Sequence, residues 1–365
     1  MAAFAVGLVA LAALAGLLFV ALNPRTLKGR HVEAGIAPQR NVATSSEAPR
    51  AATKPTERLF GPKSFWNTPV GDEPIDPNSA SLVQALAAEV QREIQSRVGP
   101  WIATSTSSTT LYRVARDQRH VRVKLDTEGT PGERALQKAF RSVPIPSHGR
   151  PSAGVDHHMT IWQPSTDRLW EFWQVRHAAD GWHARWGGAI RNVSDNPGYY
   201  TASAWPGARR NWGATASSLP VVGGVMTIPE IERGAIDHAL AMNVPASRAG
   251  TFAWPAQRTA GTGSESALPE GARLRLDPAL DIGSLNLPPL TKMIALAAQR
   301  YGLVVRDQTH KGISLFAQDP HGAGGHPYTR LFAKQSPLDY LSKFPWDRLQ
   351  VLRMHLCTQA PCRAG

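Results

Sequence analysis

The sequence predicts an α+β protein with a mainly antiparallel, β-sandwich-like core and helices at its periphery. A chain of 365 residues with 42% hydrophobic and 19% charged residues is large enough to bury such a core. Many short apolar stretches alternate with polar residues and end in Gly, Pro, Asn or Asp, a pattern typical of strands joined by turns. Longer stretches with apolar residues at helical spacing lie between them.

The N-terminal residues 1–22 have no charged side chain and are long enough to span a bilayer, so we expect a transmembrane or signal-anchor segment. Arg25, Lys28 and Arg30 follow this segment, and the positive-inside rule, applied literally, would place the rest of the chain in the cytoplasm; the stretch that follows favours export instead. Residues 23–58 contain a small, polar, proline-punctuated stretch typical of a flexible extracytoplasmic tether. We therefore expect export, with the domain held at the membrane or secreted after signal cleavage.

A single β-rich globular domain is expected over residues 59–345, followed by a C-terminal tail at residues 346–365. The tail contains the only two cysteines, Cys357 and Cys362. They are close enough in sequence for a small disulfide loop, and equally consistent with two unpaired thiols.

The elements before residue 150 alternate between helix and strand. A helix is expected from Asn78 or Ser79 to Ile94, because apolar residues recur there at helical spacing before Gly99 and Pro100. Residues 101–126 are strand-like, and a short helix is expected from Pro131 to Phe140.

Residues 155–190 predict three antiparallel strands joined by turns at residues 164–167 and 178–181. With four residues in the first turn, Thr160 faces Glu171 and His158 faces Trp173; across the second turn, Gly188 faces Glu171 and Trp186 faces Trp173. Gly188 then leaves space above the carboxylate. One face of the hairpin therefore gathers polar and aromatic residues: Asp156, His158, Thr160, Trp162, Glu171 and Trp173.

The remaining elements are a helix from Pro229 through Leu240, strands at residues 253–256 and 272–276, a helix at 290–301, and a hairpin. The hairpin pairs residues 303–305 with residues 313–316.

Glu171 is the candidate catalytic acid or base, because a carboxylate among aromatic residues is costly unless it has a partner, and His158 lies within reach. Asp156 and Glu171 are about 13 Å apart along the strand, too far for the carboxyl pair of a glycosidase, which needs at most about 9.5 Å. A glycosidase pair would then need the two side chains to converge, or a third acid such as Asp195 or Asp237. The alternative is that the tryptophans are core residues and Asp156 caps a turn.

Histidines are concentrated in the same region, which raises the question of a metal site with Asp156 and Glu171 as oxygen ligands. Their spacing fits no zinc signature and alternates between strand faces, so we expect no metal and no cofactor. His238 is either a helix-face residue or a residue brought to the cleft. The histidines concerned are His148, His157, His158, His177 and His183.

Several of these motifs together resemble a family of exported bacterial β-rich proteins, over roughly residues 60–318. The resemblance implies one integral domain and directs attention to Asp156, His158, Glu171 and His238, but it implies no reaction. This chain departs from the pattern in its tryptophan-rich strands and in the loop between Asn192 and Trp212. The matching motifs are Asp156-x-His158, Leu169-x-Glu171, residues 187–189, Ile236-x-His238-Ala239-Leu240, residues 253–256 and residues 271–276.

The expected function is that of a surface-tethered carbohydrate-active enzyme that cleaves a polysaccharide in an aromatic-lined groove. Glu171 acts as general acid or base, His158 is its partner, and Asp156 orients the imidazole or activates water. A net charge of +12 favours an acidic polymer, which makes a lyase reaction competitive with hydrolysis; no Lys/Arg run exceeds two residues, so no nucleic acid partner is expected. Expected substrate-binding residues are Trp162, Trp173, Trp186, His238 and Arg176. The alternatives are a non-catalytic glycan-binding or cell-wall-associated protein and a metal-dependent enzyme.

Overall fold

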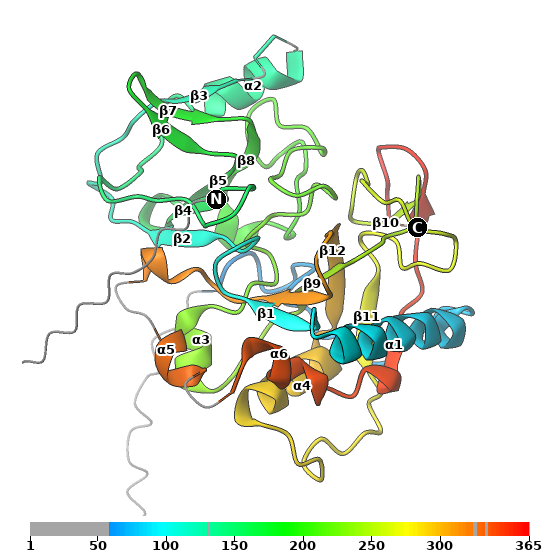
Figure 1. The fold of residues 1–365 in the computed structure, drawn as a ribbon. Helices are drawn as coiled ribbons and strands as arrows, with labels where there is room; N and C mark the ends of the chain where they lie inside the picture. The colour runs from blue at the N-terminus through cyan, green and yellow to red at the C-terminus, as the bar shows by residue number, and fades with distance from the viewer. Residues whose placement is uncertain (1–57, 127, 130, 324–326, 333–334, 365) are drawn as a thin grey trace, which may run out of the picture. The chain divides into compact units, whose positions relative to one another are not determined.

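The computed structural model describes residues 58–126, 128–129, 131–323, 327–332 and 335–364 (Figure 1). The expected membrane segment and nearly all of the expected linker lie outside these residues. Within the described part, no helix combines the length and apolar character needed to cross a membrane. The described residues belong to one compact unit.

The β-rich α+β class predicted from the sequence is confirmed, and the strands form four separate sheets (Figure 1). The largest sheet has six strands and mixes parallel and antiparallel pairs. In spatial order its strands are β1 (Trp101–Ala103), β13 (Ser314–Phe316), β9 (Leu240–Val244), β12 (Leu303–Gln308), β11 (Arg273–Leu276) and β14 (Leu349–Val351).

A four-stranded sheet is also mixed, because β2 and β4 are parallel while β4, β5 and β8 are antiparallel. Its strands are β2 (Thr110–Arg113), β4 (Met159–Gln163), β5 (Arg168–Trp173) and β8 (Trp186–Arg191). The smaller sheets contain β3 (Val123–Leu125), β7 (Gly181–Ala184) and β6 (Arg176–Ala178), and β10 (Phe252–Ala253) with β15 (Leu356–Cys357).

The predicted register of the central hairpin is confirmed. Thr160 pairs with Glu171, Glu171 with Gly188, and Trp173 with Trp186. The four residues of the turn fix this pairing: a 3-10 turn at Pro164–Thr166 ends in Asp167, which adopts a left-handed conformation with φ 54°.

The same region contains five strands where three were predicted. Gln174 adopts a left-handed conformation with φ 50°, which ends β5. The distal hairpin β6–β7 then leaves the four-stranded sheet and pairs with β3. The predicted register between β5 and β8 is kept, because β8 begins at Trp186, directly opposite Trp173 at the end of β5.

Two further predictions were wrong, both around β9. The helix that begins near Pro229 ends at Arg233 (α3, Ile228–Arg233), because Gly234 takes a left-handed conformation with φ 80° and its N–H caps the helix. The following residues form β9, which is buried along its whole length. The expected hairpin of β12 and β13 is absent, since the two strands flank β9 on opposite sides.

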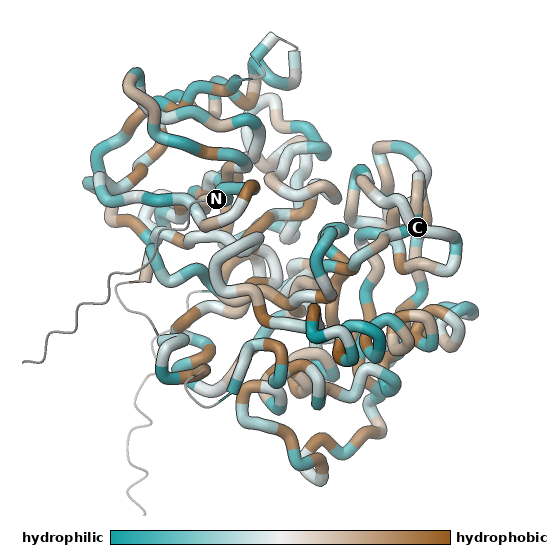
Figure 2. The backbone as a smooth tube through the Cα atoms, viewed as in Figure 1, coloured by the Kyte–Doolittle hydropathy of each residue, from teal (hydrophilic) through white to brown (hydrophobic). Residues whose placement is uncertain are grey.

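The three longer helices were predicted correctly: α1 (Ser79–Ser96), α2 (Pro131–Ala139) and α4 (Pro289–Arg300). Helix α1 has an apolar side and a polar side (Figure 2). Its apolar side packs into the core cluster of the six-stranded sheet. A second core cluster surrounds the four-stranded sheet. The remaining helices are α5 (Tyr328–Leu331) and α6 (Pro337–Ser342), with 3-10 turns at Pro164–Thr166, Val193–Asp195, Pro320–Gly322 and Trp346–Arg348.

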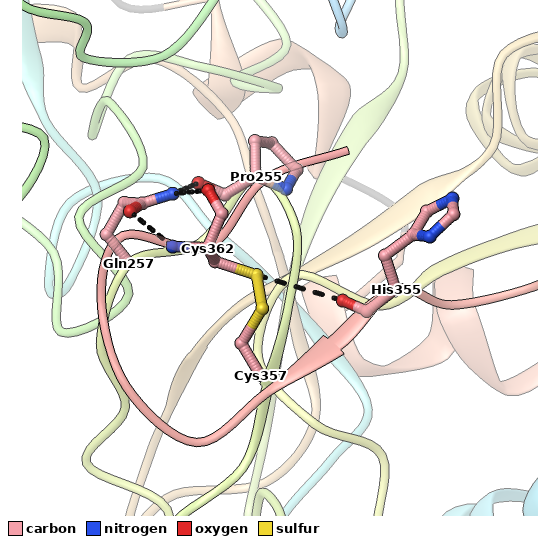
Figure 3. The surroundings of a disulfide bond; sticks show 5 residues. All are labelled: Pro255, Gln257, His355, Cys357 and Cys362. Atoms are coloured by element: carbon pink, nitrogen blue, oxygen red, sulfur yellow. Dashed lines mark hydrogen bonds between the residues drawn. A yellow bond between two sulfur atoms is a disulfide. The ribbon is translucent and has the colours of Figure 1, made fainter. Parts of the chain in front are cut away.

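Cys357 and Cys362 form a disulfide, so the tail is a closed loop (Figure 3). Gln257 binds this loop through both ends of its amide: Nε2 donates to the Cys362 carbonyl at 2.9 Å and Oε1 accepts from the Cys362 N–H at 3.1 Å. Of the expected strand at 253–256 only Ala253 is in a strand (β10), because Pro255 lacks an N–H for the ladder.

Candidate functional site

Glu171 organises a segment of the long loop that follows β8. Its Oε1 accepts the Ala214 N–H at 2.8 Å and its Oε2 accepts the Val221 N–H at 2.8 Å. The side chain is completely buried, and burial raises its pKa to about 7 although the two backbone donors act in the opposite direction. We call residues 213–221 the pinned segment, because Glu171 fixes its backbone at two points.

The space that Gly188 leaves opposite Glu171 is filled by Tyr200. A Cβ on Gly188 would lie 2.1 Å from the Tyr200 hydroxyl, a distance that no real contact allows. Tyr200 is itself buried, and its hydroxyl lies beside the Glu171 carboxylate, so that burial and this carboxylate together raise the pKa of the phenol. Glu171 is therefore covered on the side where the sequence predicted open space.

His158 contacts the pinned segment at the same residue, Ala214, but through the next peptide group. Its Nε2 donates to the Ala214 carbonyl oxygen at 3.2 Å, and the Ser108 backbone lies within hydrogen-bonding range of the buried ring. His158 and Glu171 thus meet through Ala214 and have no direct hydrogen bond with each other. Burial lowers the pKa of His158 to about 4, so the imidazole is neutral at physiological pH.

Asp156 lies just before β4 and is half-exposed. Its Oδ1 accepts the indole N–H of Trp173 at 3.1 Å. It also interacts electrostatically with His158, Arg306 and Asp307, so the cluster continues toward the six-stranded sheet.

Asp307, at the end of β12, approaches the pinned segment from the six-stranded sheet. Its Oδ2 accepts the Ala216 N–H at 3.1 Å. Asp307 is half-exposed as a residue, whereas its carboxyl group is densely surrounded by protein atoms. It therefore lies at the edge of the cluster. Burial raises the pKa of its carboxyl to about 6.

Arg306 supplies a buried positive charge beside these acids. Its Nη1 donates to the Val221 carbonyl, and the guanidinium lies 4.0 Å from the centroid of the Phe316 ring. Only 1% of the residue is exposed, and desolvation lowers its pKa to about 10. It remains charged and offsets the negative charge of Asp307, Glu171 and Asp156.

Glu270 and Arg258 complete the cluster. Glu270 is completely buried, its Oε2 has no hydrogen-bond partner among the described residues, and burial together with Asp307 raises its pKa to about 8. Arg258 is half-exposed and donates through Nη2 to the carbonyl groups of Gly213 (3.2 Å) and Thr215 (2.7 Å). The pinned segment is therefore held by side chains from both large sheets.

The three tryptophans expected to bind sugars have different environments. Trp162 is only 9% exposed and belongs to the core cluster, with the Arg113 guanidinium 5.6 Å from its ring. Trp173 and Trp186 are half-exposed and face each other across β5 and β8. Two of the three tryptophans are thus within reach of a ligand.

Other residues predicted for the site lie elsewhere. His238 binds Glu230 at 3.1 Å and the Ala239 carbonyl at 2.8 Å, in a pair next to α3. Arg176 is exposed and donates to Asp126 at 2.6 Å. Asp237, a candidate third acid, forms ion pairs with Arg58 at 3.6 Å and Arg233 at 3.0 Å.

Asp195, the other candidate third acid, is exposed at the end of a 3-10 turn. The structure instead brings Asp307 and Glu270 to the cluster, and sequence reasoning missed both. Asp307 follows the buried apolar residues of β12, and Glu270 comes shortly before β11, so an acid next to a buried apolar stretch is the signal that points to both. Sequence reasoning also missed Arg258 and Arg306.

Among the described residues, no group of three or more His, Cys, Asp or Glu side chains is arranged to hold a metal ion. A pocket of about 190 Å³ lies between α1 and residues 263–268, and none of the clustered charges lines it. No family model, curated protein or solved structure matches this chain.

Proposed function

We propose that the protein is a carbohydrate-active enzyme that cleaves a polysaccharide by general acid–base catalysis at the edge of the charged cluster. One observation supports this most strongly: two half-exposed acidic residues, Asp156 just before β4 and Asp307 near the end of β12, reach the same charged cluster next to the half-exposed Trp173. Acid–base cleavage needs two carboxyl groups with different proton affinities beside a surface that binds the sugar.

Asp307 is the proposed general acid. Its raised pKa, about 6, leaves part of the population protonated near neutral pH. Glu270 shares this raised affinity, so the pair titrates as a unit and holds a proton near neutrality. Glu270 itself is buried and acts as the partner that tunes Asp307.

Asp156 is the proposed base or water-orienting group. The indole N–H of Trp173 fixes its Oδ1, which leaves its second oxygen for a water or a sugar hydroxyl. Neutral His158 interacts electrostatically with Asp156 and donates its Nε2–H to the Ala214 carbonyl. These roles replace the expected pairing of His158 with Glu171.

Glu171 has a positioning role in this proposal. Its carboxylate has two backbone donors and no exposed surface, so it reaches no substrate. It holds Ala214 and Val221, and through them the peptide groups that His158, Arg258 and Asp307 contact.

Sugar-release assays on neutral and uronate-containing polymers test the proposal. Asp307→Asn should lower kcat by about 10²–10³-fold with little change in KM, because an amide cannot transfer the proton. Asp195→Asn, an exposed acid outside the cluster, is the matched control. Unsaturated uronate products would identify a lyase, and full activity of Asp307→Asn would contradict the assigned role.

A non-catalytic glycan-binding protein is the second candidate, favoured by the cross-strand pair Trp173 and Trp186. It predicts that Trp173→Ala abolishes polymer binding while Asp307→Asn leaves function intact. Attachment to the outer face of a membrane or secretion remains a prediction from residues 1–22.

A further inference from the structure

Two arginines face each other directly across the four-stranded sheet. Arg168 on β5 pairs with Arg191 on β8, and both side chains are exposed. Directly opposed side chains have Cβ atoms about 5 Å apart, and like charges in this position destabilise a sheet. An uncompensated pair therefore indicates that something other than folding keeps both charges in place.

No acid neutralises this pair among the residues described. Neither arginine forms an ion pair there, and the sequence neighbour Asp167 has both oxygens occupied by Ser194, at 2.9 Å from its N–H and 2.8 Å from its hydroxyl. The two guanidinium groups thus present donors to solvent.

An aromatic ring lies beside the pair, and the helix that packs against β8 carries two further cations. The Arg168 guanidinium is 5.7 Å from the centroid of half-exposed Trp205, and the chain next to Trp205 is bound to β8, where the Arg191 N–H donates to the Ala204 carbonyl at 2.8 Å. Helix α2 packs against β8 and against Gly207. It carries the exposed residues Arg134 and Lys138, four positions apart and hence on one side of the helix.

This surface is separate from the acid cluster. Arg168 and Glu171 are an odd number of positions apart on β5, so their side chains leave opposite faces of the sheet. The acids pin the loop on one face, and the cations lie on the other.

We propose that Arg134, Lys138, Arg168, Arg191 and Trp205, the arginine surface, bind an acidic polysaccharide. Planar guanidinium groups match carboxylates in two-point contacts, and a tryptophan ring stacks on the face of a sugar. Bound carboxylates also relieve the repulsion between Arg168 and Arg191. The binding does not depend on cleavage at Asp307, so an anchoring role holds even for a chain that the acid cluster never cuts.

Binding of soluble polygalacturonate, measured by calorimetry at low and high salt, tests this surface. The double variant R168Q/R191Q should bind at least about tenfold more weakly and with a smaller salt dependence. R116Q/R119Q, which removes two exposed arginines from the turn after β2, should bind like the unmodified protein. Equal loss in both double variants would mean a net-charge effect and would overturn the proposal.

Stability and specificity provide independent readouts. R191Q should raise Tm slightly, because it removes only repulsion, and a fall in Tm would count against the uncompensated pair. A single-stranded RNA or anionic vesicles bound as tightly as the uronate polymer, with the same arginine dependence, would contradict a polysaccharide partner. D307N should bind polygalacturonate normally, so loss of cleavage and loss of anchoring are separable.

Discussion

Two histidines near the same sheet, His158 and His183, show opposite responses to their surroundings. His158 is buried beside the pinned segment, and desolvation lowers its pKa to about 4. His183 lies on β7, where Asp126 and Asp180 each accept from one ring nitrogen at 2.9 Å, and these bonds raise its pKa. At His158 burial outweighs the charge of Asp156 and favours the neutral ring, whereas two hydrogen-bonded acids favour the charged ring at His183.

The same contrast separates the carboxyl groups around the pinned segment, which we call the buried region, from those around His183, which we call the surface region. Asp126 and Asp180 at the surface have lowered pKa values because cations bind them, Arg176 among them. Glu171, Glu270 and Asp307 have raised values because desolvation outweighs their hydrogen bonds. The raised values lie near neutral pH, so the carboxyl groups of the buried region can change protonation there, whereas those of the surface region stay ionised.

The largest effect is expected from Glu171→Ala, because it leaves the N–H groups of Ala214 and Val221 buried without an acceptor. The loss in unfolding free energy should be about 2–4 kcal/mol, measured by urea denaturation. Asp126→Ala in the surface region, with partners that water can solvate, should cost far less. Equal losses would show that burial does not distinguish the two regions.

Gly188→Ala should destabilise the protein by about 1–3 kcal/mol, because the new methyl group overlaps the Tyr200 ring. A double variant with Tyr200→Ala removes the overlapping atoms and should recover part of the loss relative to Tyr200→Ala alone. Additive losses in a thermal unfolding cycle would show that Tyr200 is not what fills the space.

Stability should depend on pH in a direction set by the buried acids. Their folded-state pKa values, raised to about 7 for Glu171 and about 8 for Glu270, mean that the folded protein binds more protons, so this contribution is present below pH 4.5 and is lost as the pH rises to 8. Glu270→Gln should flatten the slope of unfolding free energy by up to about 1 kcal/mol per pH unit. An unchanged slope would contradict the raised pKa.

His183→Gln should give the smallest effect. Because its folded-state pKa is raised above 6.5, its contribution to stability is fully present below pH 6.5 and is lost as the pH rises from there through the raised value. The cost at pH 6 should be under about 1 kcal/mol and should shrink in 1 M salt, because surface ion pairs are screened. A loss that persists in high salt would place His183 with the buried region.

Local patterns predicted the hairpin well and the cluster poorly, for physical reasons. The turn of residues 164–167 sets the pairing of Thr160 with Glu171, and strand alternation sets which face Glu171 occupies. Neither pattern contains the contacts of Asp307 or Glu270, which come from parts of the chain about 100 residues or more away. The helix predicted through Leu240 failed because Gly234 ends it, a position that helical spacing alone does not reveal.

The pinned segment is recognised entirely through its main chain: Glu171, His158, Arg258 and Asp307 all bind its peptide groups. Such contacts tolerate a change of side chain, because every residue except proline offers the same N–H and C=O. Ala216 is the one position from 213 to 221 that is half-exposed. Ala216 is therefore the position of the pinned segment where a larger side chain can be introduced at the site while the backbone stays fixed.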